Sequence, residues 1–143
     1  MKFSLFIETE REEEVIVYAH RESELTESIK DLVSGTNNNL VGYKNNELVK
    51  INLENVYCFT IENNKLYAVM EKEKLLIKQR LYQIEEMLGS KYIKINQSSI
   101  ANINFIDRFD ASIGGTLTVI FKNKYKDYVS RRQIKEVKKR MGI

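Results

Sequence analysis

The stretch Tyr92-Ile93-Lys94-Ile95-Asn96-Gln97-Ser98-Ser99-Ile100-Ala101-Asn102-Ile103-Asn104-Phe105-Ile106 decides how this chain folds. Successive side chains of a strand point to opposite faces, so Ile93 and Ile95 indicate a strand over residues 92–95 with one buried face. A second strand is predicted over residues 101–105, and Ile100 and Ile103 complete the buried pattern. The stretch therefore predicts two short strands separated by polar residues.

Short strands are predicted on both sides of this stretch. Their ranges are 40–44, 47–51, 56–61, 66–70, 74–77, 117–121 and 125–129. Asn45-Asn46, residues 62–65 and Asn123-Lys124 have the composition of tight turns between them. A helix is predicted over residues 78–88 with Gly89 as its C-cap, and a final basic helix is predicted after Ser130 as its N-cap.

The pattern of apolar and polar residues predicts that the first 36 residues form a separate unit. Residues 3–8 and 13–19 are rich in β-forming residues and predict two strands, while residues 22–33 predict a helix with one apolar face. The polar residues 34–39 then break the pattern. We therefore expect an acidic β-β-α extension over residues 1–36, too small to be stable alone, and a main domain over residues 37–143.

Charge is distributed unevenly along the chain. Residues 91–143 hold 12 Lys and Arg against 4 Asp and Glu, and residues 37–90 hold 7 of each. Residues 1–36 hold 4 basic against 9 acidic residues, so the formal net charge of +3 conceals an acidic and a basic end. One basic end is typical of a protein that meets a polyanion, which makes nucleic acid the first partner to consider.

Composition excludes several other classes. The chain is 43% hydrophobic and 30% charged, as globular proteins are, and no stretch approaches 18 consecutive apolar residues, so a cytoplasmic protein is expected. Cys58 is the only cysteine and His20 the only histidine, which leaves no disulfide and no multi-histidine metal site. Gly114-Gly115 lacks the context of a phosphate-binding loop. We expect no catalytic residues, no metal and no cofactor, and a buried, inert thiol at Cys58.

Four segments in order resemble the LytTR-type DNA-binding domain, the output domain of many bacterial transcription regulators. Residues 55–59, with 66–69 as hairpin partner, resemble its "I-x-Y-I/F-E" strand, and the helical residues 81–88 resemble "L-x-x-L-E-x-x-L". Residues 92–106 follow "F-x-R-I-H-R-S-Y-I-V-N-L-x-x-I", and residues 128–132 resemble "I-P-V-S-R-R". The resemblance covers roughly the 100 residues after the polar break.

This resemblance implies a mostly β fold with few helices, in which short antiparallel sheets pack into an elongated sandwich. It also implies that loops read DNA in successive major grooves, here residues 62–65, 94–98 and 130–132. The implied DNA-binding residues are Asn64, Lys65, Lys94, Asn96, Gln97, Ser98, Ser130, Arg131, Arg132 and Lys135.

The side-chain chemistry suits these positions. Cations neutralise phosphates, so Lys65, Lys94, Arg131 and Lys135 are phosphate candidates. Arg can form paired hydrogen bonds with guanine, and Asn or Gln can do so with adenine. Arg132 and Gln97 are therefore the first candidates for base readout, and Asn64 is the next. The hydroxyls of Ser98 and Ser130 can meet a phosphate, although Ser130 is equally suited to cap a helix.

Several alternatives stay open at this stage. Asn96 and Gln97 stand where the family has a His and a basic residue, and Lys94 stands where an Arg is usual, which predicts a weaker electrostatic grip. Asn63-Asn64 suits a plain hairpin turn as well as a contact, and residues 138–140 suit a solvated helix face. A protein-interaction module on the same sandwich is therefore the alternative to a DNA-binding regulator.

The organisation along the chain bears on partners. Thirty-six residues cannot hold a phospho-receiver domain, so a stand-alone regulator is expected that binds double-stranded DNA as a homodimer on repeated half-sites. The acidic extension is expected either to dimerise or complete the sandwich, or to receive a signal from a membrane-protein partner encoded nearby.

Overall fold

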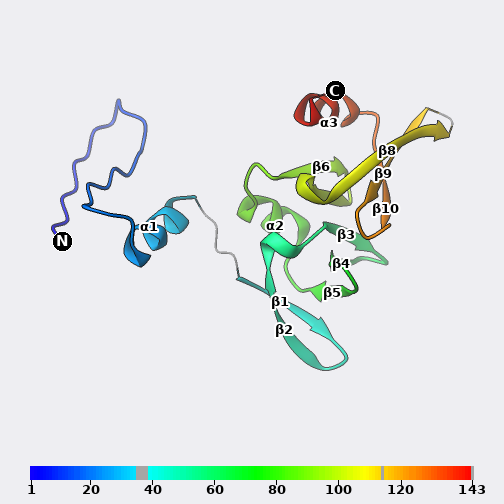
Figure 1. Cartoon of the computed structure of the whole chain (residues 1–143), viewed down its shortest axis with the longest axis horizontal. Helices are drawn as coiled ribbons and strands as arrows, with labels where there is room; N and C mark the ends of the chain where they lie inside the picture. Colours follow the sequence, from blue (N-terminus) through cyan, green and yellow to red (C-terminus); the bar gives the residue numbers. More distant parts are fainter. Residues whose placement is uncertain (35–38, 114, 143) are drawn as a thin grey trace.

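Ten strands form two antiparallel sheets in the computed structural model of the chain, which describes residues 1–34, 39–113 and 115–142 (Figure 1). The first sheet has the strand order β2-β1-β5-β4-β3-β7-β6 and the second the order β10-β9-β8. The strands of the first sheet are β1 (Asn39–Lys44), β2 (Glu47–Asn52), β3 (Cys58–Glu62), β4 (Lys65–Val69), β5 (Lys74–Ile77), β6 (Tyr92–Asn96) and β7 (Ser99–Asn102). Those of the second are β8 (Ile106–Ile113), β9 (Thr116–Phe121) and β10 (Lys126–Val129). The expected mostly β fold of short antiparallel sheets is confirmed.

Three helices occur in the described parts of the chain. They are α1 (Glu24–Ser34), α2 (Leu81–Met87) and α3 (Ile134–Met141). Ser23 begins α1, because its N–H donates to the Thr26 hydroxyl at 2.9 Å while the Thr26 N–H donates to the Ser23 hydroxyl at 3.4 Å. Gly142 ends α3 with a φ of 74°, a left-handed conformation that glycine adopts without strain. Within the same described residues, none of the helices has the length and apolar character that crossing a membrane would need.

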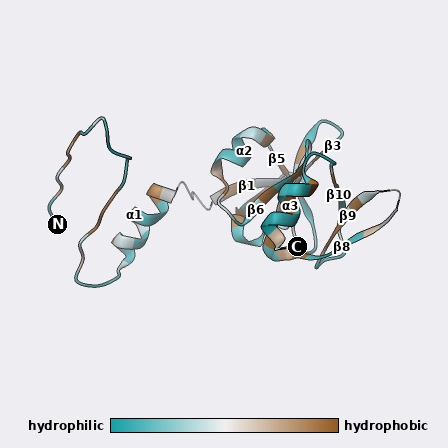
Figure 2. Cartoon of the chain, turned by 90° about the horizontal axis from the view of Figure 1, so that it is seen from above, coloured by the Kyte–Doolittle hydropathy of each residue, from teal (hydrophilic) through white to brown (hydrophobic). Residues whose placement is uncertain are grey.

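The two faces of the first sheet bury two separate hydrophobic cores. On β7, Ile100 belongs to the core beneath α2, and its neighbour Ala101 belongs to the core shared with the second sheet and α3. Ile93 and Ile95 on β6 join the second core, as their period-two spacing predicted. In Figure 2 the apolar brown stretches of the strands lie inside this β-domain, whereas α2 and α3 are mainly teal. The quoted stretch thus contributes to both cores.

Asparagines shape the connections between strands. Asn45 and Asn46 have φ values of 48° and 66°, and β1 and β2 pair up to the flanking residues, so the predicted two-residue hairpin turn is confirmed. Asn52 and Asn102 each end a strand and accept a backbone N–H two residues on, from Glu54 and Asn104 respectively, both at 3.0 Å. Each of these bonds starts a short 3-10 helix, η1 (Leu53–Asn55) or η2 (Ile103–Phe105).

The β-β-α unit expected over residues 1–36 is correct for its helix and wrong for its two strands. α1 forms where residues 22–33 predicted a helix, but residues 3–8 and 13–19 have no strand pairing. An isolated two-stranded hairpin is marginal in water without a third strand or a helix to cover it. Here the apolar side chains face solvent, with Phe6 82% and Ile7 85% exposed. The expected β-β-α extension is therefore a segment without helix or strand followed by one helix.

Three further expectations need correction. The strand predicted over residues 101–105 ends at Asn102, since η2 follows, and β8 was not predicted. Gly89 does not cap α2, because the helix ends at Met87 and its C-cap is Leu88, whose backbone is extended. Gly114 lies outside the described residues, as do residues 35–38, where the boundary between the two units was expected.

Candidate nucleic-acid interface

The three loops that the sequence pointed to lie next to one another. The Ile61 N–H donates to the carbonyl oxygen of Ser98 at 2.9 Å, which joins the end of β3 to the β6–β7 turn. The Ser130 N–H donates to the carbonyl oxygen of Ile95 at 2.8 Å, which joins the segment after β10 to the end of β6. Residues 62–65, 94–98 and 130–132 therefore form one surface, which we call the loop face.

The β3–β4 connection is a two-residue hairpin turn. Asn63 and Asn64 have φ values of 51° and 63°, and Glu62 pairs with Lys65 across the turn. Asn tolerates positive φ better than most residues, which favours it in such turns. The turn interpretation of Asn63-Asn64 is thus correct, and the side chains of Asn64 and Lys65 are exposed at its tip.

Asn96 does not belong to the exposed part of the loop face. Its side chain is 1% exposed, and Nδ2 donates to Asp127 Oδ1 at 3.1 Å and to the Tyr128 carbonyl oxygen at 2.9 Å. Its Oδ1 accepts the Ser98 N–H at 2.8 Å. Because its amide is buried and its hydrogen bonds are made, the structure gives no support to the expected contact between Asn96 and DNA. Asn96 holds the β6–β7 turn against β10 instead.

Asp127 organises the polar layer beneath the loop face, and sequence reasoning missed it. One carboxylate oxygen accepts from Asn96, and the other accepts the Ser99 hydroxyl at 2.6 Å. The Ser99 and Thr60 hydroxyls lie 2.8 Å apart. Asp127 thereby links β10 to β6, β7 and β3. Its one signal in the sequence is that it is the only acidic residue among the basic residues of the stretch 122–135.

Two titratable groups beside this layer, Cys58 and Tyr125, have raised pKa values. Burial, and then the charge of Asp127, raises the pKa of the Cys58 thiol well above its ordinary value. Burial also raises the pKa of the Tyr125 phenol, with smaller contributions from Cys58 and Asp127. Cys58 is fully buried, as expected, and its protonated thiol is unreactive for that reason.

Three polar side chains lie in the β6–β7 turn or near the end of β6. Gln97 is exposed at the tip, and Ser98 beside it is half-buried. Lys94 is also half-buried, and its Nζ lies 4.0 Å from Glu85 Oε2. Gln97 thus has the freedom to contact a ligand that the neighbouring Asn96 lacks.

The segment after β10 is a turn, not the first turn of a helix. The carbonyl oxygen of Ser130 accepts the N–H groups of Gln133 at 2.9 Å and Ile134 at 3.1 Å, and α3 begins only at Ile134. Ser130 is therefore not the N-cap that the sequence predicted. Because the chain turns here, the side chains of Arg131 and Arg132 are exposed on the loop face.

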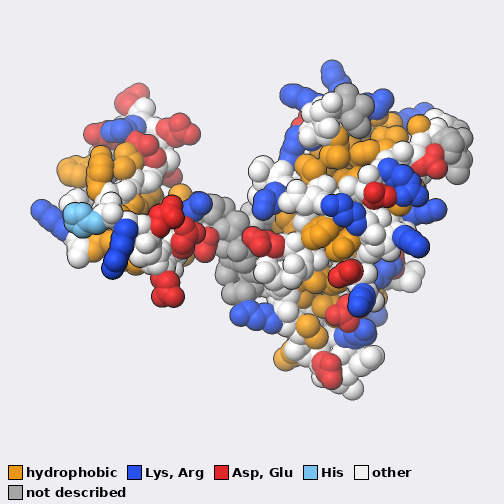
Figure 3. All heavy atoms as spheres, in the orientation of Figure 1, with side chains coloured by type: hydrophobic (Ala, Val, Ile, Leu, Met, Phe, Trp, Pro, Cys, Tyr) orange, Lys and Arg blue, Asp and Glu red, His pale blue; other side chains and the backbone are white. Residues whose placement is uncertain are grey.

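Basic side chains continue from the loop face onto α3. In Figure 3, Lys and Arg gather along the top and right rim of the β-domain, whereas Asp and Glu concentrate on the N-terminal unit. Lys135, Lys138 and Lys139 are exposed on α3. The Arg140 guanidinium instead donates to the carbonyl oxygen of Ser90, so the last cation of the basic run anchors the helix.

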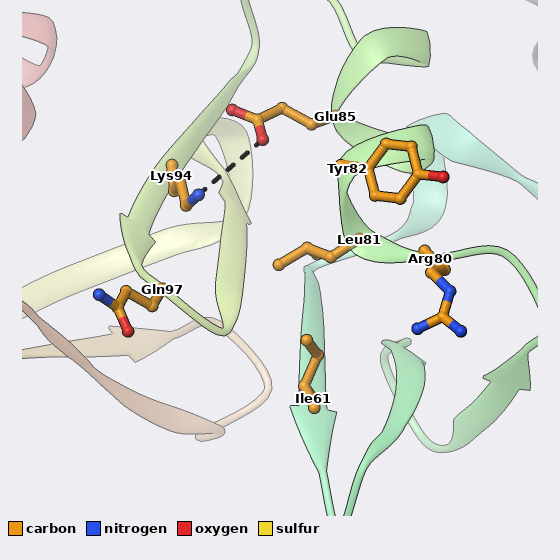
Figure 4. A pocket seen from close by; sticks show the side chains of 7 residues that line it. All are labelled: Ile61, Arg80, Leu81, Tyr82, Glu85, Lys94 and Gln97. Atoms are coloured by element: carbon orange, nitrogen blue, oxygen red, sulfur yellow. Dashed lines mark ion pairs between the residues drawn. The ribbon is translucent and has the colours of Figure 1, made fainter.

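A groove of about 310 Å³ opens beside Gln97, between α2 and the β6–β7 turn (Figure 4). Gln97 and Lys94 lie on one side of it and Arg80 and Tyr82 on the other, with Ile61 between them. Arg80 and Tyr82 are exposed. Sequence reasoning missed both, because they fall in the predicted helix over residues 78–88, outside the three loops.

Comparison with known proteins gives two kinds of match to the sequence. Residues 46–142 match the model of the LytTr DNA-binding domain family. Relatives from Staphylococcus aureus strains MSSA476 and MW2, each named an uncharacterized HTH-type transcriptional regulator, are 31% identical to this chain over 146 residues. These alignments cover 100% of this chain and 99% of each relative, so they include the N-terminal unit.

A solved structure shares the fold. A LytTr DNA-binding domain from Bacillus cereus superimposes with a TM-score of 0.68 at 19% sequence identity. The match covers 74% of this chain and 98% of that domain.

Proposed function

The chain belongs to the LytTr DNA-binding domain family, and on this premise we propose that it regulates transcription by reading double-stranded DNA with its loop face. Family membership and the relatives named as transcriptional regulators support DNA as the partner over a protein-interaction module. One observation carries the proposal: three loops with exposed cationic and amide side chains meet on a single surface.

Affinity comes from cations in this proposal. Lys65, Lys94, Arg131 and Lys135 contact phosphates and release counterions, which supplies binding energy without sequence information. All four side chains are exposed or half-buried, so none needs to leave a buried site to reach DNA. Binding should accordingly weaken steeply as salt rises.

Sequence reading falls to residues with paired donors and acceptors. Arg132 can bond both guanine acceptors, and Gln97 and Asn64 can each bond adenine in the major groove. The Ser98 and Ser130 hydroxyls, both half-buried, are suited to fix a phosphate beside those bases.

The reading elements are loops and not a recognition helix. A helix-turn-helix places its second helix after a turn of a few residues. Here β1 to β5 separate α1 from α2, and β6 to β10 separate α2 from α3. The "HTH-type" in the relatives' names therefore does not describe the fold of this chain.

The remaining assignments follow from DNA as the partner. Residues 37–143 act as the DNA-binding domain, and residues 1–36 act as a separate unit that pairs two chains on repeated half-sites. Its exposed apolar side chains are the support for that pairing, and contact with a membrane-protein partner is the alternative use of the same surface. We assign the chain to the cytoplasm, where it meets DNA, and give it no catalytic role.

Selection of bound sequences from a random duplex pool tests the proposal, with Arg132→Ala run in parallel. We expect a repeated motif to be enriched, and we expect Arg132→Ala to lose preference at one position at a cost of about 1–3 kcal/mol. Lys50→Ala, an exposed cation on β2 at the far edge of the seven-stranded sheet, is the control and should keep the motif. No enrichment by the intact chain at low salt would contradict sequence-specific binding.

A further inference from the structure

The groove beside Gln97 combines positive charge with apolar surface. Arg80 and Lys94 lie on its opposite sides, and Ile61 and Leu81 line it between them (Figure 4). Tyr82 is 59% exposed at its edge, so much of a large aromatic side chain is open to a ligand. A nucleic-acid backbone offers the matching chemistry, because charged phosphates alternate with deoxyribose rings that present C–H faces.

Both cations are available to a ligand. No carboxylate in residues 1–34, 39–113 and 115–142 lies within ion-pair distance of the Arg80 guanidinium. Lys94 faces Glu85 at 4.0 Å, and the two side chains are 38% and 50% exposed. Ion pairs that are exposed to solvent contribute little to stability. A phosphate can therefore replace Glu85 as the partner of Lys94 at a small cost in free energy.

The position of Gln97 connects the groove to the loop face. Gln97 belongs to the loop face and also lines the groove. A duplex whose base edge meets Gln97 would therefore carry its neighbouring backbone across the groove towards Arg80.

We propose that this groove is a second DNA-contact site, which binds the sugar–phosphate backbone flanking the bases read by the loop face. Arg80 and Lys94 each neutralise a phosphate. Tyr82 packs against a deoxyribose that lies between these two phosphates. Glu85 competes with the phosphate for Lys94 and so lowers the affinity of the intact chain. This inference rests on the proposed function, adds Arg80 and Tyr82 to its contact residues and makes Glu85 a competitor of the DNA phosphate.

The most informative variant is Glu85→Gln, because it should improve binding and misfolding cannot produce that result. Binding to the selected duplex is measured as a function of salt for this variant and for Glu86→Gln. Glu86 is an exposed neighbour on α2 that does not line the groove, so its variant removes the same charge nearby. We expect Glu85→Gln to tighten binding several-fold at low salt, and Glu86→Gln to change it much less.

Arg80→Ala tests the other side of the groove. It should reduce the log–log salt slope by about 0.9, the value of one phosphate contact, while Arg80→Lys should restore the slope. Lys50→Ala removes one cation from the far edge of the sheet and should leave the slope unchanged.

Each outcome decides the inference. Equal binding by Glu85→Gln and Glu86→Gln, or an Arg80→Ala slope equal to that of Lys50→Ala, would overturn the groove as a DNA site. This failure differs from failure of the proposed function, in which the intact chain would select no sequence at all. Tighter binding with Glu85→Gln and a reduced slope with Arg80→Ala would support the second contact site.

Discussion

Two adjacent residues at the β6–β7 turn have opposite roles. Asn96 is buried and makes three hydrogen bonds, to Asp127, Tyr128 and Ser98, whereas Gln97 is exposed with its amide open to solvent. Because the buried amide fixes the turn, the exposed one is presented in a defined place. Order in the loop face thus depends on a residue whose own side chain is buried.

Asn96→Ala should destabilise the fold by about 1–3 kcal/mol, because it leaves buried partners without a hydrogen bond. Gln97→Ala, its matched control, should leave the free energy of unfolding unchanged and alter base preference instead. Urea unfolding and binding to the selected duplex separate the two effects. Equal stability of both variants would contradict the structural role of Asn96.

At the scale of elements, close packing decides where β1 can sit. Gly42 is buried on β1, and a Cβ added there would lie 2.7 Å from Ile51 Cδ1 and 2.7 Å from Leu75 Cβ. The Ile51 contact is the end of a flexible side chain, but Leu75 Cβ moves only with its backbone. The distance between β1 and its neighbours therefore requires glycine at this position.

Gly42→Ala should accordingly cost about 1–3 kcal/mol through overpacking, measured as a lower midpoint of urea unfolding. Gly89→Ala is the control, because an added Cβ there meets nothing within 4 Å. We expect Gly89→Ala to unfold like the intact chain. A Gly42→Ala variant as stable as Gly89→Ala would show that β1 can shift.

At the scale of the whole molecule, an acidic unit with exposed apolar side chains is joined to a basic DNA-binding domain. Leu32 of α1 is 82% exposed, and Ile7 and Val17 of the segment before α1 are 85% and 40% exposed. Exposed apolar surface of this kind marks an interaction site, which supports the proposed pairing of two chains through this unit. Residues 1–36 of each chain hold 9 acidic against 4 basic residues. The N-terminal units of two chains therefore repel each other electrostatically.

Pairing and DNA binding should therefore respond to salt in opposite directions. Salt screens the repulsion between two acidic units and should strengthen pairing, while it weakens DNA binding. Sedimentation velocity of the full chain at low and high salt measures the first effect. The double substitution Ile7→Ser with Val17→Ser should abolish pairing, whereas Leu48→Ser, which removes an exposed leucine from β2, should not. A chain that stays monomeric at every concentration and salt would contradict the proposal.

Local patterns predicted much of the β-domain. The hairpin turns at Asn45-Asn46 and Asn63-Asn64 and the buried Ile93, Ile95 and Ile100 depend on residues close in sequence, and all occur as predicted. The strands expected over residues 3–8 and 13–19 failed, because a strand needs a partner that local sequence does not supply.

The sequence by itself determined the family, most of the short strands after residue 39 and the residues that make up the three loops. These features depend on side-chain periodicity, turn residues and motif order, which are local properties of the chain. Only the tertiary structure decided that Asn96 is buried, that Asp127 organises the layer beneath the loops, and that Arg80 lies across a groove from Lys94. Burial and proximity arise from contacts between strands distant in sequence, which no local pattern encodes.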